Sequence, residues 1–569
     1  MIPSLVPPRA AMAVAEGPLP HEQVDVVVVG GGINGTGVAR DLALRGARVA
    51  LFERNDLAFG ASGNSSGMIH GGVRYLSTAP HVTEESCRDS GYIQRIAPHL
   101  LFRIPFLMPV RTGAMRRVYF ELLDAYFRAY DDFQDLKHSE PHCRLDAADT
   151  LRLEPGLVGS IVGGITFDEW GVDGGRLCVL NAVDAVEHGA RVFTHTAVES
   201  ISRAPADAAA PRSYVVQARD RRTGAALRVR ARTVVNATGA WGPVTAALGG
   251  LDGANVRVRP GKGIHVVLDR RITNYAILSE AIDGRQVFLC PWQNVTLVGT
   301  TDDDYYGDLD DVHATSEEVR YLVQGVARTL PGVRTARAIG TTAGVRPTLF
   351  AYGPNEDALS RDHRVVDHTA DGAPAVYSMI GGKLASFRLF AQEAADRIAS
   401  RDLGLQAPCS THARPLPGGS AVPDAVALSR RHRITPVAAR RLIYRHGSRA
   451  LDLLERAAGR PRDLDVVCPC EPVLEAEVRN AVRREWACSV DDVARRTRLG
   501  LGACGGMRCA ARCGQIVAEE LARPPSWGRT TALAFLQHQA RGRVVALGPD
   551  QARQEALVAA HVRSSLGSA

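Results

Sequence analysis

The residues with the clearest chemical potential in this sequence are three glycines and an acidic residue near its beginning. Gly30, Gly32 and Gly35 follow the apolar run Val26–Val29, and Glu53 comes further along the chain. The first glycine allows a tight turn, the second lets the backbone approach a pyrophosphate, and the third lets a helix pack closely on a sheet. The Glu53 carboxylate can accept hydrogen bonds from ribose hydroxyls. This spacing predicts a dinucleotide site.

Such a site needs a strand, a helix and a second strand to position it. The run Val26–Val29 is typical of a buried parallel strand, and Asn34–Arg45 is typical of a helix. A second β pattern, Arg48–Phe52, ends at Glu53. Phosphate would lie at the helix N-terminus, beside Asn34. A chance glycine-rich turn is the alternative, but the order of these segments favours a βαβ nucleotide unit, which serves NAD and FAD alike.

Basic side chains indicate a second kind of chemistry. Among 68 basic residues, lysine occurs only at Lys137, Lys262 and Lys383. A guanidinium does not imitate a compact ammonium, so the lysines in glycine-rich contexts, Lys262 and Lys383, suggest functional positions. Histidine alone titrates near neutrality without perturbation, which makes His70 and His265 candidate proton acceptors. The alternative is that these lysines are ordinary surface residues and that these histidines have structural roles.

Composition narrows the class of protein. The chain has 569 residues, 45% of them apolar, which predicts two or three domains with large cores. The net charge of +7 is small for this length and weakly favours an anionic substrate or an anionic membrane surface. No basic run or aromatic ladder supports nucleic acid as a partner. No apolar run approaches the roughly 20 residues that a membrane span needs, so we expect a cytoplasmic protein, with peripheral association at the inner face of the cell membrane as an alternative.

The segment from Glu53 to Leu76 resembles the flavin loop of one family, the FAD-dependent glycerol-3-phosphate dehydrogenases, which are DAO-type flavoproteins. Further motifs follow in the order of that family: Asn236–Trp241, Gly299–Asp302, Gly344–Pro347, Ser360–Asp362 and Gly381–Leu384. The resemblance covers roughly residues 24 to 400. It implies FAD as the cofactor and sn-glycerol 3-phosphate as the substrate.

The resemblance also implies roles for individual residues. Arg74 and Tyr75 would meet the substrate phosphate, and Arg361 would help to fix the substrate. Arg346 and Lys383 would approach the reacting alcohol, where Arg346 could lower the pKa of that alcohol in place of a histidine base. The residues that the resemblance places against FAD, in addition to the glycine motif, are Ser62, Ser66, His70, Val198, Ala237, Gly239, Gly382, Lys383 and Leu384.

Cysteines form the second strong pattern, near the other end of the chain. Five of the eleven are scattered, whereas six crowd together: Cys468, Cys470, Cys488, Cys504, Cys509 and Cys513. Such clustering in a cytosolic enzyme is typical of a metal site. Helical segments at 472–486 and 490–498 would bring the two cysteine loops together.

The spacing of Cys468, Cys470, Cys504 and Cys509 resembles the [2Fe-2S] domain of bacterioferritin-associated ferredoxin. The same domain is appended to the catalytic subunit of anaerobic glycerol-3-phosphate dehydrogenases, and four thiolates suit such a cluster. Zinc is the competing metal, but a CxC pair is tighter than its usual spacing. Unligated thiols are a further alternative, and Cys488 or Cys513 could replace Cys509.

These patterns predict an α/β protein. A Rossmann-like FAD-binding domain interleaves with an antiparallel-sheet substrate domain, and an α-helical C-terminal domain with the cysteine cluster follows. The expected segments are a disordered tail at 1–23, an oxidoreductase region at 24–404, a helical domain at 405–467, a [2Fe-2S] domain at 468–520 and a helical tail at 521–569.

The predicted function is the FAD-dependent oxidation of sn-glycerol 3-phosphate to dihydroxyacetone phosphate. Electrons would pass through the cluster to a quinone, an electron-transfer protein or a partner subunit. One alternative is a flavin oxidase of an amine or hydroxyacid, for which a phosphate-binding Arg74 would have no partner. Another is a flavin and iron-sulfur redox sensor without turnover.

Overall fold

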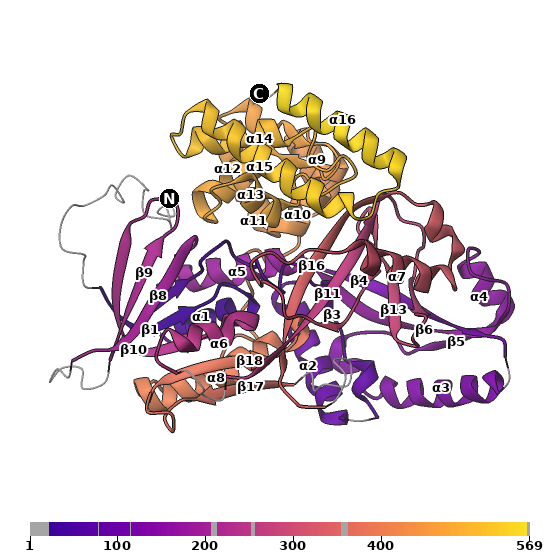
Figure 1. Ribbon diagram of the computed structural model, residues 1–569, viewed down its shortest axis with the longest axis horizontal. Helices are drawn as coiled ribbons and strands as arrows, with labels where there is room; N and C mark the ends of the chain where they lie inside the picture. The colour runs from indigo at the N-terminus through magenta and orange to yellow at the C-terminus, as the bar shows by residue number, and fades with distance from the viewer. Residues whose placement is uncertain are drawn as a thin grey trace.

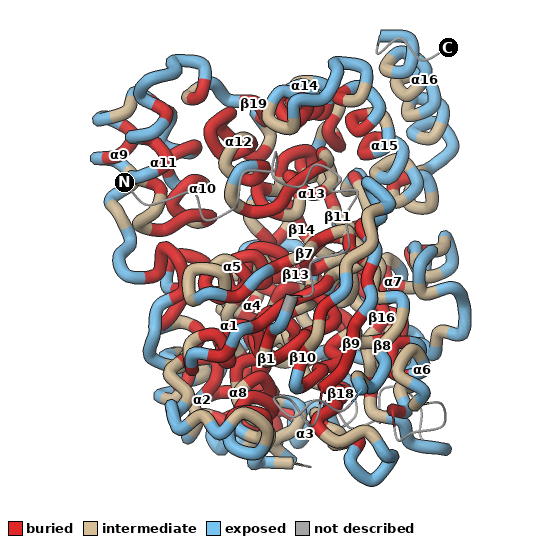
Figure 2. The backbone as a smooth tube through the Cα atoms, turned by 90° about the vertical axis from the view of Figure 1, so that its left-hand side faces the viewer, coloured by how far each residue is buried: buried red, intermediate tan, exposed pale blue. Residues whose placement is uncertain are grey.

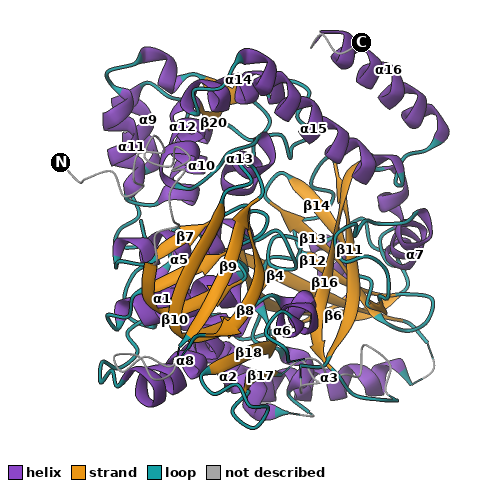
Figure 3. Cartoon of the chain, turned by 60° about the vertical axis from the view of Figure 1, so that its left-hand side comes forward, coloured by secondary structure: helices purple, strands orange, loops and turns teal. Residues whose placement is uncertain are grey.

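The computed structural model of the chain describes residues 22–77, 79–113, 115–205, 213–251, 256–353 and 362–565. Two β-sheets lie side by side, and a helical C-terminal region covers one end of both (Figures 1 and 3). The predicted N-terminal tail lies outside the described residues, apart from positions 22 and 23, which belong to the first strand.

The first sheet has a parallel centre. Its described strands are β1 (Glu22–Val29), β2 (Val49–Phe52), β7 (Arg191–Phe193), β8 (Thr196–Arg203), β9 (Tyr214–Asp220), β10 (Ala226–Asn236), β17 (His363–Asp367) and β18 (Val376–Gly381). Strand β1 pairs in parallel with β2 on one side and β10 on the other. A strand covered on both faces must be apolar throughout, which explains the valine run Val26–Val29.

Helices α1 (Ile33–Leu44), α5 (Gly174–Glu187) and α8 (Phe387–Ile398) pack together against this sheet. The close approach depends on small residues, since a Cβ at Gly37 would lie 3.1 Å from Cβ of Ala391 on α8. A buried ion pair fixes α1 to α5, with Arg40 Nε 2.6 Å from Asp184 Oδ2. The buried interior of this layer is visible around β1, β10 and α1 in Figure 2.

The second sheet forms the other half of the body. Its described strands are β3 (Met68–Ile69), β4 (Leu101–Arg111), β5 (Cys143–Asp146), β6 (Ile161–Val172), β11 (Val258–Leu268), β12 (Ala276–Glu280), β13 (Gln286–Trp292), β14 (Val295–Gly299), β15 (Asp303–Asp304) and β16 (Ala338–Leu349). Its strands alternate along the chain with those of the first sheet, so the predicted interleaving is confirmed. The sheet is antiparallel apart from the pair β4 and β12, which runs parallel.

Further helices flank the sheets. These are α2 (Pro80–Ile96), α3 (Arg116–Asp131), α4 (Ala147–Leu153), α6 (Gly242–Ala247) and α7 (Ser316–Ala327). Residues 226–236 form the single long strand β10. One long strand is possible because β10 pairs with β9 along its first half and with β1 along most of its length.

The C-terminal region is helical, as predicted. It contains α9 (Ala425–His432), α10 (Pro436–His446), α11 (Arg449–Ala457), α12 (Glu475–Arg484), α13 (Val490–Thr497), α14 (Ala510–Glu520), α15 (Pro525–Val544) and α16 (Pro549–Ser565), with the hairpin β19 (Val466–Cys468) and β20 (Val473–Leu474). Phe535 of α15 lies in the same apolar core as Cys468 and Cys513. No helix within the described ranges is long and apolar enough to cross a bilayer.

Candidate functional site

A cavity of about 900 Å³ lies between the two sheets. Its walls come from the glycine loop and β2 end of the first sheet, from β4, β6, β13 and β16 of the second sheet, and from α3. This volume is at the upper end of the range for ligand pockets, about 300 to 1,000 Å³. A cavity of this size accommodates a large cofactor.

Most residues predicted for the site line this cavity: Gly30, Gly32, Asn34, Glu53, Ser62, Ser66, His70, Arg74, Tyr75, Val198, Ala237, Gly239, Arg346, Gly382, Lys383 and Leu384. Two predicted residues, Gly35 and His265, lie behind the lining. Arg361 lies outside the described residues. The structure thus brings together residues from many separate stretches of the chain.

The glycine loop between β1 and α1 has no room for side chains. Gly30 has a φ of +110°, and a Cβ there would lie 2.6 Å from the carbonyl oxygen of Ala237 on the neighbouring loop. A Cβ at Gly35 would lie 1.9 Å from the carbonyl oxygen of Gly30. Helix α1 therefore starts directly at the loop, with no capping side chain and no acidic residue in its first turn. The Ile33 N–H donates to Ser62 Oγ at 3.0 Å, and the N-terminus of the helix has a positive potential that suits a phosphate.

Two polar groups of this loop face the cavity. Glu53 accepts hydrogen bonds from the backbone N–H groups of Gly31 at 2.7 Å and Asn55 at 2.8 Å. Burial raises the pKa of this carboxyl group. The side-chain oxygen Oδ1 of Asn34 is buried without a hydrogen-bond partner in the described structure. A polar cofactor would satisfy this atom, since buried polar groups are nearly always hydrogen-bonded.

Cationic side chains gather around Tyr75 in the cavity wall. The Lys383 ammonium lies 4.2 Å from the ring centroid of Tyr75, and the Arg74 guanidinium lies 5.0 Å from the same centroid. The 3-10 helix Val73–Tyr75 carries Arg74 and Tyr75, while Lys383 follows β18. Two cations around one aromatic ring give this wall a strong preference for an anion.

Arg346 on β16 supplies a third cation. Its Nη1 lies 2.8 Å from Asp302 Oδ1, and its Nη2 donates to Thr300 Oγ1 at 3.1 Å. Asp302 and Thr300 belong to a motif that the resemblance identified, and both line the cavity. The ion pair holds the guanidinium in one orientation beside the cavity.

The two candidate proton acceptors lie in strongly positive surroundings. Burial and the charges of Lys383, Arg74 and Lys137 lower the pKa of His70 to about 3. Burial and Arg346 lower the pKa of His265 to about 3. His265 Nε2 lies 2.9 Å from Ser66 Oγ, so this ring contacts the cavity wall and not the cavity itself. Both histidines are therefore neutral at pH 7 in the free protein.

Sequence reasoning missed a buried group behind His70. Glu169 on β6 accepts hydrogen bonds from the Gly71 N–H at 2.9 Å and from the Tyr130 hydroxyl at 3.0 Å. The Lys137 ammonium lies 3.1 Å from Glu169 Oε2, fully buried. Lys137 stands in no glycine-rich motif, so its only sequence signal was the scarcity of lysine.

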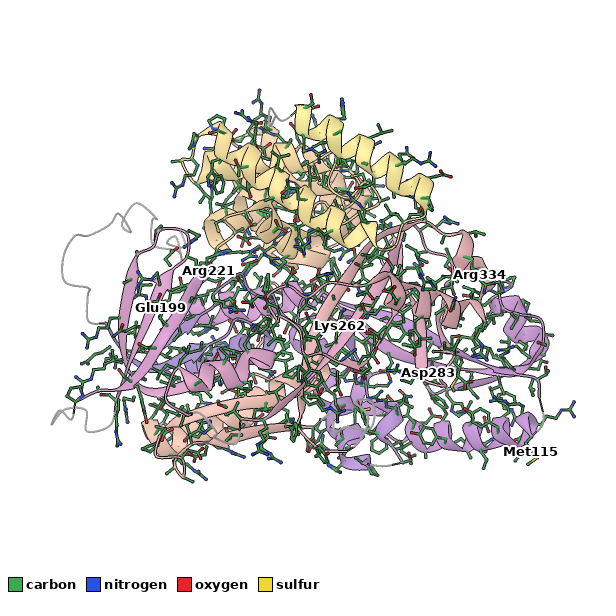
Figure 4. The ribbon with its side chains drawn as sticks, in the orientation of Figure 1. Met115, Glu199, Arg221, Lys262, Asp283 and Arg334 are labelled. Carbon is green, nitrogen blue, oxygen red and sulfur yellow. The ribbon has the colours of Figure 1, made fainter. Side chains whose placement is uncertain are left out.

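Lys262, by contrast, does not line the cavity. Its Nζ lies 2.8 Å from Glu318 Oε2 at the N-terminus of α7 (Figure 4). Of the two lysines in glycine-rich contexts, only Lys383 lines the cavity.

The cysteines predicted as metal ligands converge in the C-terminal region. Cys468 contacts Cys509, and Cys470 contacts Cys504. The Cys468 sulfur accepts hydrogen bonds from three backbone N–H groups, those of Cys470, Glu471 and Gly500. Together with the contact to Cys509, they lower the pKa of Cys468 to about 6. Thiolate at this position is therefore favoured near neutral pH.

The two alternative ligands differ in position. Burial and the nearby charge of Cys468 raise the pKa of Cys513, so Cys513 lies beside the four predicted ligands. Cys488 instead donates to Asp492 Oδ2 at 3.2 Å, and Asp492 Oδ2 also lies 3.1 Å from His195 Nε2. These three residues could in principle hold a metal ion, but Arg495 also binds Asp492 at 3.0 Å and supplies the positive charge.

Several contacts connect the cysteine region to the elements around the cavity. The Arg498 guanidinium lies 3.9 Å from the ring centroid of Trp292 at the end of β13. Trp292 in turn lies close to Gly67, which belongs to the segment Glu53–Leu76 that resembles a flavin loop. A Cβ at Gly67 would lie 3.4 Å from Trp292 Nε1. Asp56, from the same loop, is fully buried and pairs with Arg495 at 2.7 Å. The C-terminal region therefore packs directly on the loop that forms the cavity.

Known proteins resemble this chain over most of its length. Residues 25–388 match the family of FAD dependent oxidoreductases, and residues 409–527 match the C-terminal domain of alpha-glycerophosphate oxidase. The chain is 30% identical over 540 residues to a subunit of the anaerobic glycerol-3-phosphate dehydrogenase of Haemophilus influenzae, covering 92% of this chain and 90% of that protein. It is 34% identical over 514 residues to a glycerol-3-phosphate dehydrogenase of Mycobacterium leprae, covering 88% and 85%.

A solved structure shares the fold. The glycerol-3-phosphate dehydrogenase of Bacillus halodurans, in complex with FAD, superposes with a TM-score of 0.72 at 24% identity. The match covers 93% of this chain and 96% of the other. The predicted fold class is thereby confirmed.

Proposed function

Because this chain belongs to the family of FAD-dependent oxidoreductases that contains the glycerol-3-phosphate dehydrogenases, we propose that it oxidises sn-glycerol 3-phosphate to dihydroxyacetone phosphate. The observation that carries the choice of substrate is the pair of cations, Arg74 and Lys383, around the Tyr75 ring in the cavity wall, with Arg346 as a further cation of the lining. A dianionic phosphate is the ligand that such a group of cations favours.

FAD occupies the cavity in this proposal. The pyrophosphate lies at the N-terminus of α1, where Gly30 and Gly32 let the backbone approach it. Glu53 accepts from ribose hydroxyls, and Val198 contacts the adenine side. Ser62, Ser66, Ala237, Gly239, Gly382 and Leu384 complete the wall. The support is the fit of the cavity and the unsatisfied Asn34 oxygen beside the loop.

The substrate lies between the cofactor and the cationic wall. Arg74 and Tyr75 bind the phosphate, with Arg361 as a further contact, and Arg346 and Lys383 face the C2 hydroxyl. FAD, when bound, supplies the hydride acceptor. The chain stabilises the developing alkoxide, since Arg346 and Lys383 already place positive charge in that wall.

The hydroxyl proton needs an acceptor. His70 lines the cavity and is neutral, so it has a free nitrogen lone pair, whereas His265 acts through Ser66 and orients it. The low pKa of His70 arises largely from burial and from neighbouring cations. A bound phosphate dianion would offset those charges and raise its affinity for a proton.

The cysteine group holds a [2Fe-2S] cluster in this proposal. Cys468, Cys470, Cys504 and Cys509 form two contacting pairs from two loops, and four thiolates fit the cluster. Zinc is the competing occupant. A cluster bound by these cysteines would supply one-electron transfer toward a quinone, an electron-transfer protein or a partner subunit. Segments 24–404, 405–467, 468–520 and 521–569 are the proposed divisions of the chain.

Dye reduction under anaerobic conditions tests the proposal. The purified protein with FAD should reduce an artificial electron acceptor steadily with sn-glycerol 3-phosphate, and far more slowly with glycerol, which lacks the phosphate. Turnover of a phosphate-free amine or hydroxyacid at the higher rate would instead identify an oxidase of that class. Flavin reduction without turnover by any of these would identify a redox sensor.

A further inference from the structure

The peptide that follows His70 is held from both sides. The N–H of Gly71 donates to Glu169 Oε2 at 2.9 Å, and the Cys87 thiol donates to the Gly71 carbonyl oxygen at 3.5 Å. A Cβ at Gly71 would lie 2.2 Å from the Tyr130 hydroxyl oxygen and 2.5 Å from the Cys87 sulfur. The Gly71 peptide is therefore confined to one position, and it confines the backbone of His70 as well.

The carboxylate that binds this peptide is itself held by two buried groups. The Tyr130 hydroxyl donates to Glu169 Oε1 at 3.0 Å. The Lys137 ammonium lies 3.1 Å from Glu169 Oε2 and donates to the Tyr130 hydroxyl oxygen at 3.1 Å. Lys137 and Tyr130 are completely buried, and Glu169 is 2% exposed. Both oxygens of Glu169 thus have partners, and the carboxylate has little freedom to turn.

The position of Lys137 is also specified. Its carbonyl oxygen accepts hydrogen bonds from Gln94 Nε2 at 2.6 Å and from Trp170 Nε1 at 3.0 Å. These bonds fix the 3-10 helix Asp135–Lys137 between α2 and β6. A buried ion pair is weak evidence for stability, because apolar residues of similar volume often replace one without loss. The contact of this pair with the peptide beside His70, which lines the cavity, indicates a functional reason for it.

The groups that surround the Gly71 peptide carry balanced charge. Burial raises the pKa of the Cys87 thiol to about 12 and that of the Tyr130 hydroxyl well above its ordinary range, so neither is charged at pH 7. Glu169 and Lys137 carry opposite charges and lie in contact. Behind the peptide, the negative charge of one therefore offsets the positive charge of the other.

This ion pair also bears on the charge of His70. Burial and the charges of Lys383, Arg74 and Lys137 lower the pKa of His70 to about 3. Loss of Lys137 alone would remove one of these cations and leave the Glu169 carboxylate unpaired near the imidazole. Both changes favour the protonated imidazole. The pair thus influences the protonation of His70 as well as its position.

We propose that Glu169 is a positioning residue for His70 and fixes the imidazole at the cavity wall through the Gly71 peptide. The pairing of Glu169 with Lys137 keeps the same imidazole uncharged. This inference rests on the proposed function, in which neutral His70 accepts the hydroxyl proton. A displacement of about 1 Å in a reacting group can slow a reaction about a hundredfold. Loss of the Glu169 contact should therefore slow flavin reduction, while substrate binding at Arg74 stays nearly the same.

Two charge-neutral double variants test the positioning. Lys137→Met with Glu169→Gln keeps an oxygen that can accept from the Gly71 N–H, whereas Lys137→Met with Glu169→Leu removes it. Neither leaves an unpaired buried charge, so both should fold. Stopped-flow absorbance measures anaerobic flavin reduction by sn-glycerol 3-phosphate per bound FAD. At saturating substrate the Gln variant should be reduced at least about tenfold faster than the Leu variant, with similar half-saturating concentrations.

A second buried ion pair provides the matched control. Arg445 Nε lies 2.6 Å from Glu477 Oε1 in the C-terminal region, and Glu477 Oε2 accepts from the backbone N–H of Leu474 at 3.0 Å. Neither member of this pair lines the cavity. Arg445→Met with Glu477→Leu removes a similar carboxylate and its backbone contact. It should lower stability but not the rate of flavin reduction per bound FAD.

Lys137→Met alone tests the charge. It removes a cation and leaves Glu169 unpaired, so the acidic limb of the pH profile of flavin reduction should move to higher pH by roughly one unit. Addition of Glu169→Gln removes the unpaired charge and should reverse this shift. If the single variant does not retain FAD, the two double variants decide the proposal.

Three results would overturn the proposal. The first is equal rates of flavin reduction in the two double variants. The second is an equal loss of rate per bound FAD in the Arg445 and Glu477 control, and the third is an unmoved acidic limb in Lys137→Met protein that retains FAD. A wild type that sn-glycerol 3-phosphate does not reduce would instead reject the proposed function, and this inference with it.

Discussion

The cavity and the cysteine group gather reactive residues in opposite ways. The cavity collects residues from many separate stretches of the chain around about 900 Å³ of space. The cysteine group collects four thiols from two short loops that touch one another. A site for a large organic cofactor needs open space, which glycines such as Gly30 and Gly35 provide because they have no side chain. A site for an inorganic cluster needs the side chains that bind it. Substitutions should therefore disable the two sites independently.

The largest effect is expected at the glycine loop. Gly30→Ala should remove most bound FAD while iron remains, because the new Cβ would lie 2.6 Å from the Ala237 oxygen at a φ of +110°. Gly340→Ala is the control, since a Cβ at Gly340 meets nothing within 4 Å. Flavin absorbance and iron content of the purified proteins measure the two sites. Normal flavin content in Gly30→Ala would contradict the assignment of this loop.

The converse substitution concerns the cysteines. Cys468→Ser with Cys470→Ser should abolish the visible absorbance of the cluster and slow electron transfer to the natural acceptor. Bleaching of FAD by sn-glycerol 3-phosphate under anaerobic conditions should persist, because these cysteines do not line the cavity. Metal analysis that finds zinc and no iron in the unmodified protein would reject the electron-transfer role. Loss of flavin bleaching would show that the two sites are structurally coupled through contacts such as Arg498 on Trp292.

Within the cavity, Lys383→Arg should keep FAD but lose most turnover. The ammonium lies 4.2 Å from the Tyr75 ring centroid, and a larger planar guanidinium cannot take the same place. Steady-state rates of dye reduction measure the effect. Lys262→Arg is the matched control because Lys262 lies away from the cavity. Equal rates for both variants and the wild type would remove Lys383 from the reaction.

A smaller effect is expected at the phosphate end. Arg74→Ala should raise the Michaelis constant for sn-glycerol 3-phosphate by roughly 30- to 150-fold, which corresponds to about 2 to 3 kcal/mol for a charged hydrogen bond. FAD should stay bound. Arg334→Ala, at a position on the far side of the second sheet (Figure 4), provides the control. An unchanged Michaelis constant would place the phosphate elsewhere.

The smallest effect concerns pH and stability. His70 and His265 have folded-state pKa values of about 3, whereas an unfolded histidine titrates near 6.5. The unfolded chain therefore binds more protons between these values, and the free energy of unfolding falls as pH decreases below 6.5. At pH 5.5 each histidine should lower the free energy of unfolding by about 1.4 kcal/mol. Urea unfolding at pH 7.5 and 5.5 should show a smaller pH dependence for His265→Gln than for the wild type.

The sequence was most informative where local chemistry decides the structure. The valine run and glycines predicted the end of β1, the loop and α1 to within one residue, because an apolar strand and a close backbone approach leave few alternatives, although β1 begins at Glu22, four residues before the predicted run. The sequence also predicted that the two cysteine loops come together, and the structure places Cys468 against Cys509 and Cys470 against Cys504. The family resemblance supplied Arg74, Arg346 and Lys383, whose positions in the cavity depend on the tertiary fold.

Other features could not be predicted because they depend on distant contacts. Lys137 and Glu169 lie far apart in sequence and meet only when the 3-10 helix Asp135–Lys137 packs beside β6. His265 has the residue type of a base, but its position on β11 directs it toward Ser66. The region of α3 was not assigned an element, although Phe120, Leu123 and Phe127 follow a helical period on its buried face.

One anaerobic titration tests the central claim most directly. The visible spectrum of the purified protein is recorded before and after stepwise addition of sn-glycerol 3-phosphate in the absence of other acceptors. The account predicts that the flavin bands bleach and the iron-sulfur absorbance then decreases, and that glycerol at the same concentration changes neither. A flavin spectrum that stays oxidised in the presence of excess sn-glycerol 3-phosphate would contradict it.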